Sequence, residues 1–192
     1  MIYQLEGLMY EMSDFFMAPV LILLALLFIY SLMASGAFFC EIWQRKSNCN
    51  NYHKALGNGL KAGSVNQLGG YPLTTLACQN HSISRDELDV AALEELETVR
   101  NVSRLAPMLG LIATMVPMGP ALKSLADGNI QGISENLIVA FSAVIFGLVI
   151  ASITFWIASI RKRWLAAELV SIIPRLEDIQ KQQEEVSLRE VA

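Results

Sequence analysis

The chemistry available in the apolar part of this chain is limited to hydroxyl groups. Residues 105–122 and 136–160 contain no Asp, Glu, Lys, Arg or His. The polar side chains deep in these two stretches are Thr114, Ser142, Ser152, Thr154 and Ser159. A hydroxyl donates and accepts hydrogen bonds but does not titrate near neutral pH. The chain alone therefore cannot relay a proton by titration, so it is either a passive scaffold or works with a partner that supplies the titrating group.

Small and kinking residues recur on one side of the first of these stretches. At ~100° per residue, five positions fall within roughly 60° of one another: Pro107, Gly110, Thr114, Pro117 and Ala121. Pro117 also leaves the carbonyl four residues earlier without its helical donor, which makes this face polar around Thr114.

The second stretch carries a matching face of small residues, formed by Ala140, Gly147, Ala151 and Ala158, with Thr154 at its edge. Small residues let membrane helices approach closely, and that is one interpretation of both faces. The other interpretation is a shared lumen lined by small residues and hydroxyls. The spacing alone favours neither.

Three apolar stretches are long enough to span a membrane. At ~1.5 Å per residue, residues 17–40, 105–126 and 135–160 each cross a hydrocarbon core roughly 30 Å thick. Because unpaired backbone amides are prohibitive in lipid, all three should be helices. A chain with 54% hydrophobic and 17% charged residues fits this class. We therefore expect an all-α membrane protein with three transmembrane helices and long cytoplasmic helical extensions.

Basic residues beside the spans predict their orientation. Arg45 and Lys46 follow the first span, and Arg161, Lys162 and Arg163 follow the third, whereas residues 1–16 carry neither Lys nor Arg. Such residues are retained in the cytoplasm. The N-terminus and the link 127–134 are then outside, and the loop 41–104 and the C-terminal helix 161–192 are cytoplasmic.

The polar segments before and between these spans are also predicted to be largely helical. Residues 1–16 form either an amphipathic interfacial helix or an extension of the first span. The Gly- and Asn-rich residues 51–73 predict short helices broken by turns. Ser84 and Glu87 then form a capping box. A helix with an apolar stripe follows and runs into the second span, its stripe being Leu88, Ala92, Leu96, Val99 and Val102.

Residues with catalytic or metal-binding potential form no motif. The three cysteines, Cys40, Cys49 and Cys78, have no metal-ligand spacing and are interpreted as reduced thiols. His53 and His81 have no acid or nucleophile at motif spacing, and we interpret them as surface or loop residues. No enzyme activity, resident cofactor or metal is predicted, and no basic block indicates nucleic acid.

Two sequence motifs resemble the MotA/TolQ/ExbB proton-channel subunits of bacterial ion-driven motors. The run APMLGLIATMVPMGPAL is similar to the family's second-helix signature, and VAFSAVIFGLVIASITF is similar to its third helix. The order of three helices, the topology, the stalk ahead of the second span and the basic exit of the third also match. Only residues 106–160 carry family-specific motifs.

The resemblance implies a homopentameric ring around the single membrane helices of a dimeric ExbD/TolR/MotB-like partner. In that family an Asp on the partner helix takes up and releases the proton, which would explain the missing carboxylate here. Thr114 aligns with the threonine of the family's second helix, so the resemblance implies that Thr114 lies beside the ion path. The expected pore-lining residues are Thr114, Gly110, Pro117, Ala140, Val144, Gly147, Ala151 and Thr154.

The third helix departs from the family pattern. Val144 stands where many members have a pore-facing threonine, and Ala143 precedes it. Ser142 lies about 200° from Val144 around the helix, so it cannot take that place. An ungapped match puts Val139 at the family's acidic position, with Glu135 one turn earlier.

The function expected from the resemblance is a multi-pass subunit of the bacterial or archaeal inner membrane that couples ion flow to movement of its partner. The transported ion would be H⁺, with Na⁺ the less favoured choice. The alternative is a ring that does not conduct and serves as a membrane scaffold for an envelope complex.

Overall fold

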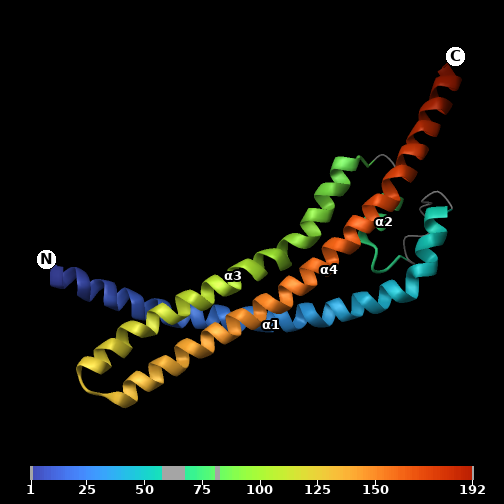
Figure 1. The fold of residues 1–192 in the computed structure, drawn as a ribbon. Helices are drawn as coiled ribbons and strands as arrows, with labels where there is room; N and C mark the ends of the chain where they lie inside the picture. The colour runs from blue at the N-terminus through green and yellow to red at the C-terminus, as the bar shows by residue number, and fades with distance from the viewer. Residues whose placement is uncertain (1, 58–67, 81–82, 192) are drawn as a thin grey trace. The chain divides into compact units, whose positions relative to one another are not determined.

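The computed structural model describes residues 2–57, 68–80 and 83–191. They form four helices: α1 (Ile2–Gly57), α2 (Pro72–Gln79), α3 (Arg85–Ala126) and α4 (Ile130–Val191) (Figure 1). No strand occurs in the part of the chain that the structure describes. The expected all-helical fold is confirmed. Among the described residues, three helical segments are long and apolar enough to cross a membrane: Met17–Lys54, Arg85–Ala126 and Ile130–Ile179.

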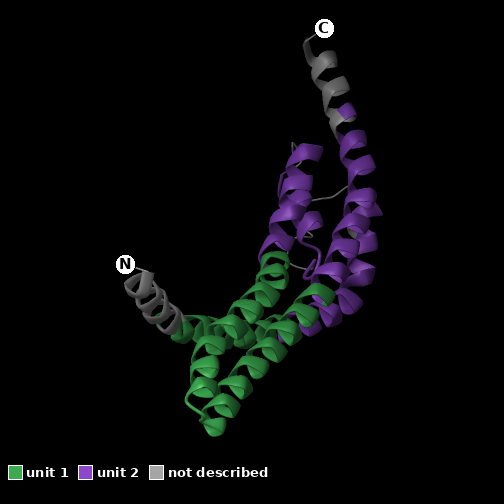
Figure 2. Cartoon of the chain, turned by 60° about the vertical axis from the view of Figure 1, so that its left-hand side comes forward, with its two compact units in different colours: residues 1–35, 99–156 green, residues 36–98, 157–192 purple. Residues whose placement is uncertain are grey.

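The chain divides into two compact units, each assembled from parts of the same long helices (Figure 2). Unit 1 contains residues 1–35 and 99–156, and unit 2 contains residues 36–98 and 157–192. Unit 1 thus holds the most apolar parts of α1, α3 and α4. Its buried residues are mostly small or aliphatic: Leu24, Ala106, Ala113, Ala143 and Ile150.

The link between α3 and α4 is shorter than the sequence indicated. α3 ends at Ala126 and α4 begins at Ile130, so helix already covers much of the predicted link 127–134. Gly128 has a φ of 71°, a left-handed conformation that favours glycine. Asn129 then caps α4, because its side-chain oxygen accepts from the amide of Gly132 at 3.1 Å. Turn and cap chemistry together explain the tight hairpin.

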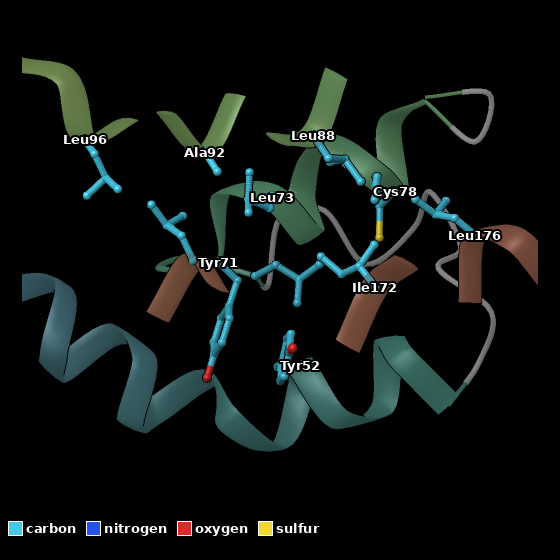
Figure 3. Close-up of a cluster of buried hydrophobic side chains, with 12 residues drawn as sticks. Tyr52, Tyr71, Leu73, Cys78, Leu88, Ala92, Leu96, Ile172 and Leu176 are labelled. Carbon is cyan, nitrogen blue, oxygen red and sulfur yellow. The ribbon is translucent and has the colours of Figure 1, made fainter. Parts of the chain in front are cut away.

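Unit 2 buries a core of larger side chains. Tyr52 of α1, Leu73 and Cys78 of α2, Leu88 of α3 and Ile172 of α4 converge in it (Figure 3). Each of the four helices therefore contributes a side chain. Cys78 is buried in this core as a free thiol, and burial raises its pKa.

The start of α3 follows the predicted capping box. The Ser84 amide donates to a carboxylate oxygen of Glu87 at 2.9 Å, and the Glu87 amide donates to the Ser84 hydroxyl at 3.2 Å. Four of the five stripe residues are buried, and Val102 is half-buried. α3 is continuous from this cap to Ala126, so the stalk helix and the second span are one helix, as expected.

α1 is longer than the sequence indicated. It runs without a break from Ile2 to Gly57, which makes the N-terminal segment an extension of the first span rather than a separate helix. Its far end corrects the prediction of short broken helices as far as Gly57, because Arg45 and Tyr52 pack into unit 2 and stabilise the helix there. Residues 58–67, where further turns were expected, and His81 lie outside the described residues.

Candidate functional site

Within unit 1, α3 and α4 approach most closely where two glycines face each other. A Cβ atom placed on Gly147 would lie 2.8 Å from the Ala106 carbonyl oxygen and 3.2 Å from the Gly110 Cα. A Cβ atom on Gly110 would lie 3.5 Å from the Val144 Cα. Contacts under 3.0 Å to a backbone atom cannot be relieved by turning a side chain. Gly147 is therefore needed for the helices to meet.

This contact assigns a place to three of the expected pore-lining residues. Gly110, Val144 and Gly147 lie at the interface between α3 and α4 of one chain. Ala140 and Pro117 are buried, and Ala151 packs against the unit 1 core. For these residues the structure favours the close-packing interpretation of the small faces.

Thr154 is also buried inside the chain. Its side chain is 0% exposed, and its hydroxyl donates to the Ile150 carbonyl at 2.7 Å. A second carbonyl, that of Ala151, lies 3.3 Å away. The hydroxyl is satisfied by its own helix, as is common for Thr in membrane helices.

Thr114 differs from Thr154 because it keeps access to the surface of the chain. Its side chain is half-buried, and its hydroxyl donates to the Leu111 carbonyl at 2.6 Å. That bond uses the single proton and leaves the oxygen free to accept. Leu111 and Met115, which lie beside it on α3, are exposed. Of the expected pore-lining residues, Thr114 is thus the one that presents a hydroxyl at an exposed helix face.

Ser142 belongs to another face of α4. It lines an apolar groove of about 550 Å³ formed with α1, together with Phe28 and Phe146, whose rings meet edge to face at 5.2 Å. Its hydroxyl donates to the Ile138 carbonyl at 2.8 Å. This placement agrees with the angular argument that Ser142 cannot replace Val144.

Ser31 of α1 was not among the polar residues singled out in the sequence. Its side chain is 0% exposed, and its hydroxyl has no hydrogen-bond partner among the described residues. The signal was available, because Ser31 is a hydroxyl residue in the middle of the first apolar stretch.

Unit 2 contains a buried ion pair that was not predicted from the sequence. Glu168 of α4 is 1% exposed, and its carboxylate contacts the guanidinium of Arg45 of α1. The same carboxylate accepts from the backbone amides of Leu73 at 3.2 Å and Thr74 at 3.4 Å, at the start of α2. Removal from water raises the pKa of Glu168 to about 7, although Arg45 and the two amides act in the opposite direction.

Aromatic rings enclose the cation of this pair. The Arg45 guanidinium lies 4.7 Å from the ring centroid of Tyr71 and 4.6 Å from that of Trp164, within cation–π range. A sequence signal for Glu168 did exist, because it interrupts an apolar stripe that includes Leu165 and Ile172. A charged residue in the middle of a buried helix face normally has a partner.

A second ion pair involves the basic cluster that follows the third span. Arg161 donates to Glu41 of α1 from its Nε at 2.8 Å, and its second nitrogen lies 2.6 Å from the same carboxylate oxygen. Lys162 and Arg163 remain exposed. Part of the cluster therefore joins α1 to α4, and the rest is available to lipid headgroups or solvent.

Metal ligation finds no support in the described residues. No group of three or more His, Cys, Asp or Glu side chains is placed to hold a metal ion there. Cys40 and Cys49 are exposed free thiols, and His53 is exposed, as expected for a loop or surface residue.

Comparison with known proteins assigns the family. The model of the MotA/TolQ/ExbB proton channel family matches residues 77–173, just over half of the chain. The match includes α3 and the first part of α4, with both small-residue faces and Thr114. No curated protein and no solved structure matches the chain significantly. The chain belongs to the MotA/TolQ/ExbB proton channel family.

Proposed function

We propose that this chain is the ring subunit of an ion-driven inner-membrane complex, in which Thr114 borders the ion path and a partner protein supplies the titrating acid. Family membership supports a proton-channel-type membrane subunit. The observation that carries the proposal is the contrast between a half-buried hydroxyl on α3 and spans without an ionisable residue. Such a chain needs an acid from elsewhere to move a proton.

The surface of α3 supports assembly with other chains. Its exposed side chains form a long apolar face in unit 1: Leu105, Met108, Leu111, Ile112, Met115, Met118, Leu122 and Leu125. In a membrane this face can meet lipid, neighbouring subunits or a partner helix. We assign it to subunit and partner contacts in a homopentamer that surrounds a dimer of single-span, ExbD/TolR/MotB-like proteins, each with a membrane Asp.

The proposed topology places the N-terminus outside and the C-terminus in the cytoplasm of a bacterial or archaeal cell. The basic residues that follow the first and third spans support it. Unit 2, which contains the cytoplasmic ends of these helices, is then the cytoplasmic part. The ion is H⁺, because the partner's carboxyl group carries it as a bound proton.

Replacing Thr114 with valine tests the role of its hydroxyl. The change keeps the shape of the side chain and removes the acceptor, so partner-dependent proton flux should fall about tenfold, the equivalent of one hydrogen bond of ~1.4 kcal/mol. Flux is measured in vesicles that contain the chain and its partner, with a pH-sensitive dye. Thr114→Ser should restore most of the flux.

The matched control is Ser152→Ala, which removes an exposed hydroxyl that donates to the Leu148 carbonyl at 2.8 Å on α4. Its flux should equal that of the wild type. If Thr114→Val conducts as well as the control while membrane insertion and assembly are normal, the Thr114 hydroxyl has no role in conduction. If the wild-type chain and its partner give no proton flux at all, the ring is the non-conducting scaffold.

A further inference from the structure

α1 presents two large aromatic side chains to the surface in unit 2. Trp43 is 77% exposed and Phe39 is 59% exposed. At ~100° per residue, these two residues and the exposed Lys46 lie within roughly 60° of one another around the helix. The opposite side of α1 is the packed one, where Arg45 and Tyr52 contact the rest of unit 2. The aromatic and basic side of α1 is thus left open by the described residues.

The position of this open side along α1 matches the edge of a bilayer. No charged residue occurs between Asp14 and Glu41. At ~1.5 Å per residue, about 20 residues that end at Phe39 cross a hydrocarbon core roughly 30 Å thick. Trp43 then lies ~6 Å beyond the core, and Lys46 lies ~10 Å beyond it. Trp is enriched at this level because its ring is apolar and its N–H group is polar, and the long side chain of Lys can reach back to the headgroups.

Two exposed bases of α4 stand at nearly the same height. A guanidinium nitrogen of Arg161 of α4 lies 2.6 Å from a carboxylate oxygen of Glu41 of α1, so the two helices are side by side at this point. The next two residues of α4, Lys162 and Arg163, are exposed. Measured along the helices, they stand within ~8 Å of Lys46. Three cations therefore lie at one level of unit 2.

The carboxylates of the same helix segments are already paired. In the unit 2 part of α1 the one acid is Glu41, which pairs with Arg161. In the unit 2 part of α4, as far as Arg175, the one acid is Glu168, which is buried and pairs with Arg45. α3 differs, because its exposed side chains in unit 2 include many carboxylates. The positive surface at this level therefore belongs to α1 and α4.

We propose that this surface is a headgroup collar, which binds anionic phospholipids of the bilayer. The collar consists of Phe39, Trp43 and Lys46 of α1 with Lys162 and Arg163 of α4. Its rings lie at the edge of the hydrocarbon core, and its cations contact the lipid phosphates. The collar rests on the proposed function only for the choice of the cytoplasmic leaflet, and it does not depend on ion conduction.

Lipid is the occupant that fits the open side of α1. Only 11% of the most apolar stretch of α1 is buried inside the chain, against 33% for the corresponding stretches of α3 and α4. The collar continues this open apolar stretch at the point where the helix becomes basic. An apolar surface that ends in Trp and Lys is complementary to acyl chains that end in anionic headgroups.

Quenching of Trp43 fluorescence by brominated lipids in nanodiscs of the full chain tests the collar. The Trp43 signal is the part of the fluorescence that is lost in Trp43→Phe. Bromine near the headgroup end of the acyl chain should quench this signal more than bromine near the methyl end. Brominated phosphatidylglycerol should be favoured about fivefold over brominated phosphatidylcholine, which corresponds to ~1 kcal/mol for one Lys close to an anionic surface.

Lys46→Gln should remove most of this fivefold preference at Trp43. Lys54→Gln is the matched control, because Lys54 is also exposed on α1 but lies ~12 Å further from the membrane, beyond the Debye length of ~8 Å at physiological salt. Its preference should equal that of the wild type. Replacing Lys162 and Arg163 together with Gln should reduce the amount of phosphatidylglycerol that copurifies with the chain.

Three results would overturn the collar. If no brominated lipid quenches Trp43, this side of α1 faces water or another protein. If phosphatidylcholine and phosphatidylglycerol quench the wild type equally, the bases do not select anionic headgroups. If the preference persists when all three bases are replaced, it arises elsewhere in the chain. A chain that shows the collar but no proton flux would contradict the proposed function alone.

Discussion

Gly147→Ala is expected to destabilise the packing of α3 against α4. The added Cβ would lie 2.8 Å from the Ala106 carbonyl oxygen and 3.2 Å from the Gly110 Cα, so the helices must separate. Overpacking of this kind costs about 1–3 kcal/mol, and Gly147→Leu should cost more. For a chain of 192 residues, each kcal/mol lowers the thermal midpoint by about 2–4 °C. Thermal unfolding in detergent, followed by tryptophan fluorescence, measures the loss.

Gly36→Ala is the matched control, because a Cβ atom at Gly36 of α1 meets nothing within 4 Å. Alanine is a better helix former than glycine by about 1 kcal/mol, and both variants gain this advantage. The difference between their thermal midpoints therefore isolates the steric cost at Gly147. Equal midpoints for the two variants, or a normal oligomer size for Gly147→Leu on a sizing column, would contradict the close contact.

The elements of the fold that follow from local patterns could be predicted from the sequence. The three apolar stretches, the Ser84–Glu87 cap and the stripe from Leu88 to Val99 each depend on residues within a few turns of one another. The structure shows all of them as predicted. Periodicity of 3.6 residues and capping chemistry are local properties, so they can be identified from the sequence without knowledge of the fold.

The end of α1 shows where local reasoning fails. Gly and Asn near residues 51–59 indicate turns, yet the helix continues to Gly57. Helix propensity differs by less than about 1 kcal/mol between these residues and good helix formers. Arg45 pairs with Glu168 of α4 and Tyr52 is buried in the unit 2 core, and these contacts stabilise the helical conformation. Tertiary packing therefore determines where α1 ends, and local sequence patterns do not indicate tertiary contacts.

The candidate site was predicted in part for a related reason. Spacing places Gly110 and Gly147 on small-residue faces, but it does not say what each face meets. In the structure the two glycines face each other, and the Thr114 side chain is only half-buried. The pair formed by Arg45 and Glu168 joins residues 123 positions apart. The apolar stripe around Glu168 indicates that this carboxylate needs a partner, but no local pattern identifies Arg45 as that partner.

Arg45→Met is expected to cost about 3–5 kcal/mol of stability when Glu168 is ionised, because it leaves a carboxylate that is 1% exposed without its counter-ion. Methionine retains the aliphatic length of the side chain, so the effect comes from the charge and its stacking on Tyr71 and Trp164. Loss of Arg45 also raises the pKa of Glu168 beyond about 7. At low pH, protonation of Glu168 removes the unpaired charge and so reduces the loss of stability in the variant. The decrease in thermal midpoint should therefore be larger at pH 8 than at pH 6.

Lys46→Met provides the control, since Lys46 is the exposed neighbour of Arg45 on the same helix. Its midpoint should match that of the wild type at both pH values. Adding Glu168→Gln to Arg45→Met removes the unpaired charge and should recover much of the lost stability, so the two changes are strongly non-additive. Additive effects, or a loss that does not depend on pH, would mean that Arg45 acts through packing alone and that the ion pair contributes little to unit 2.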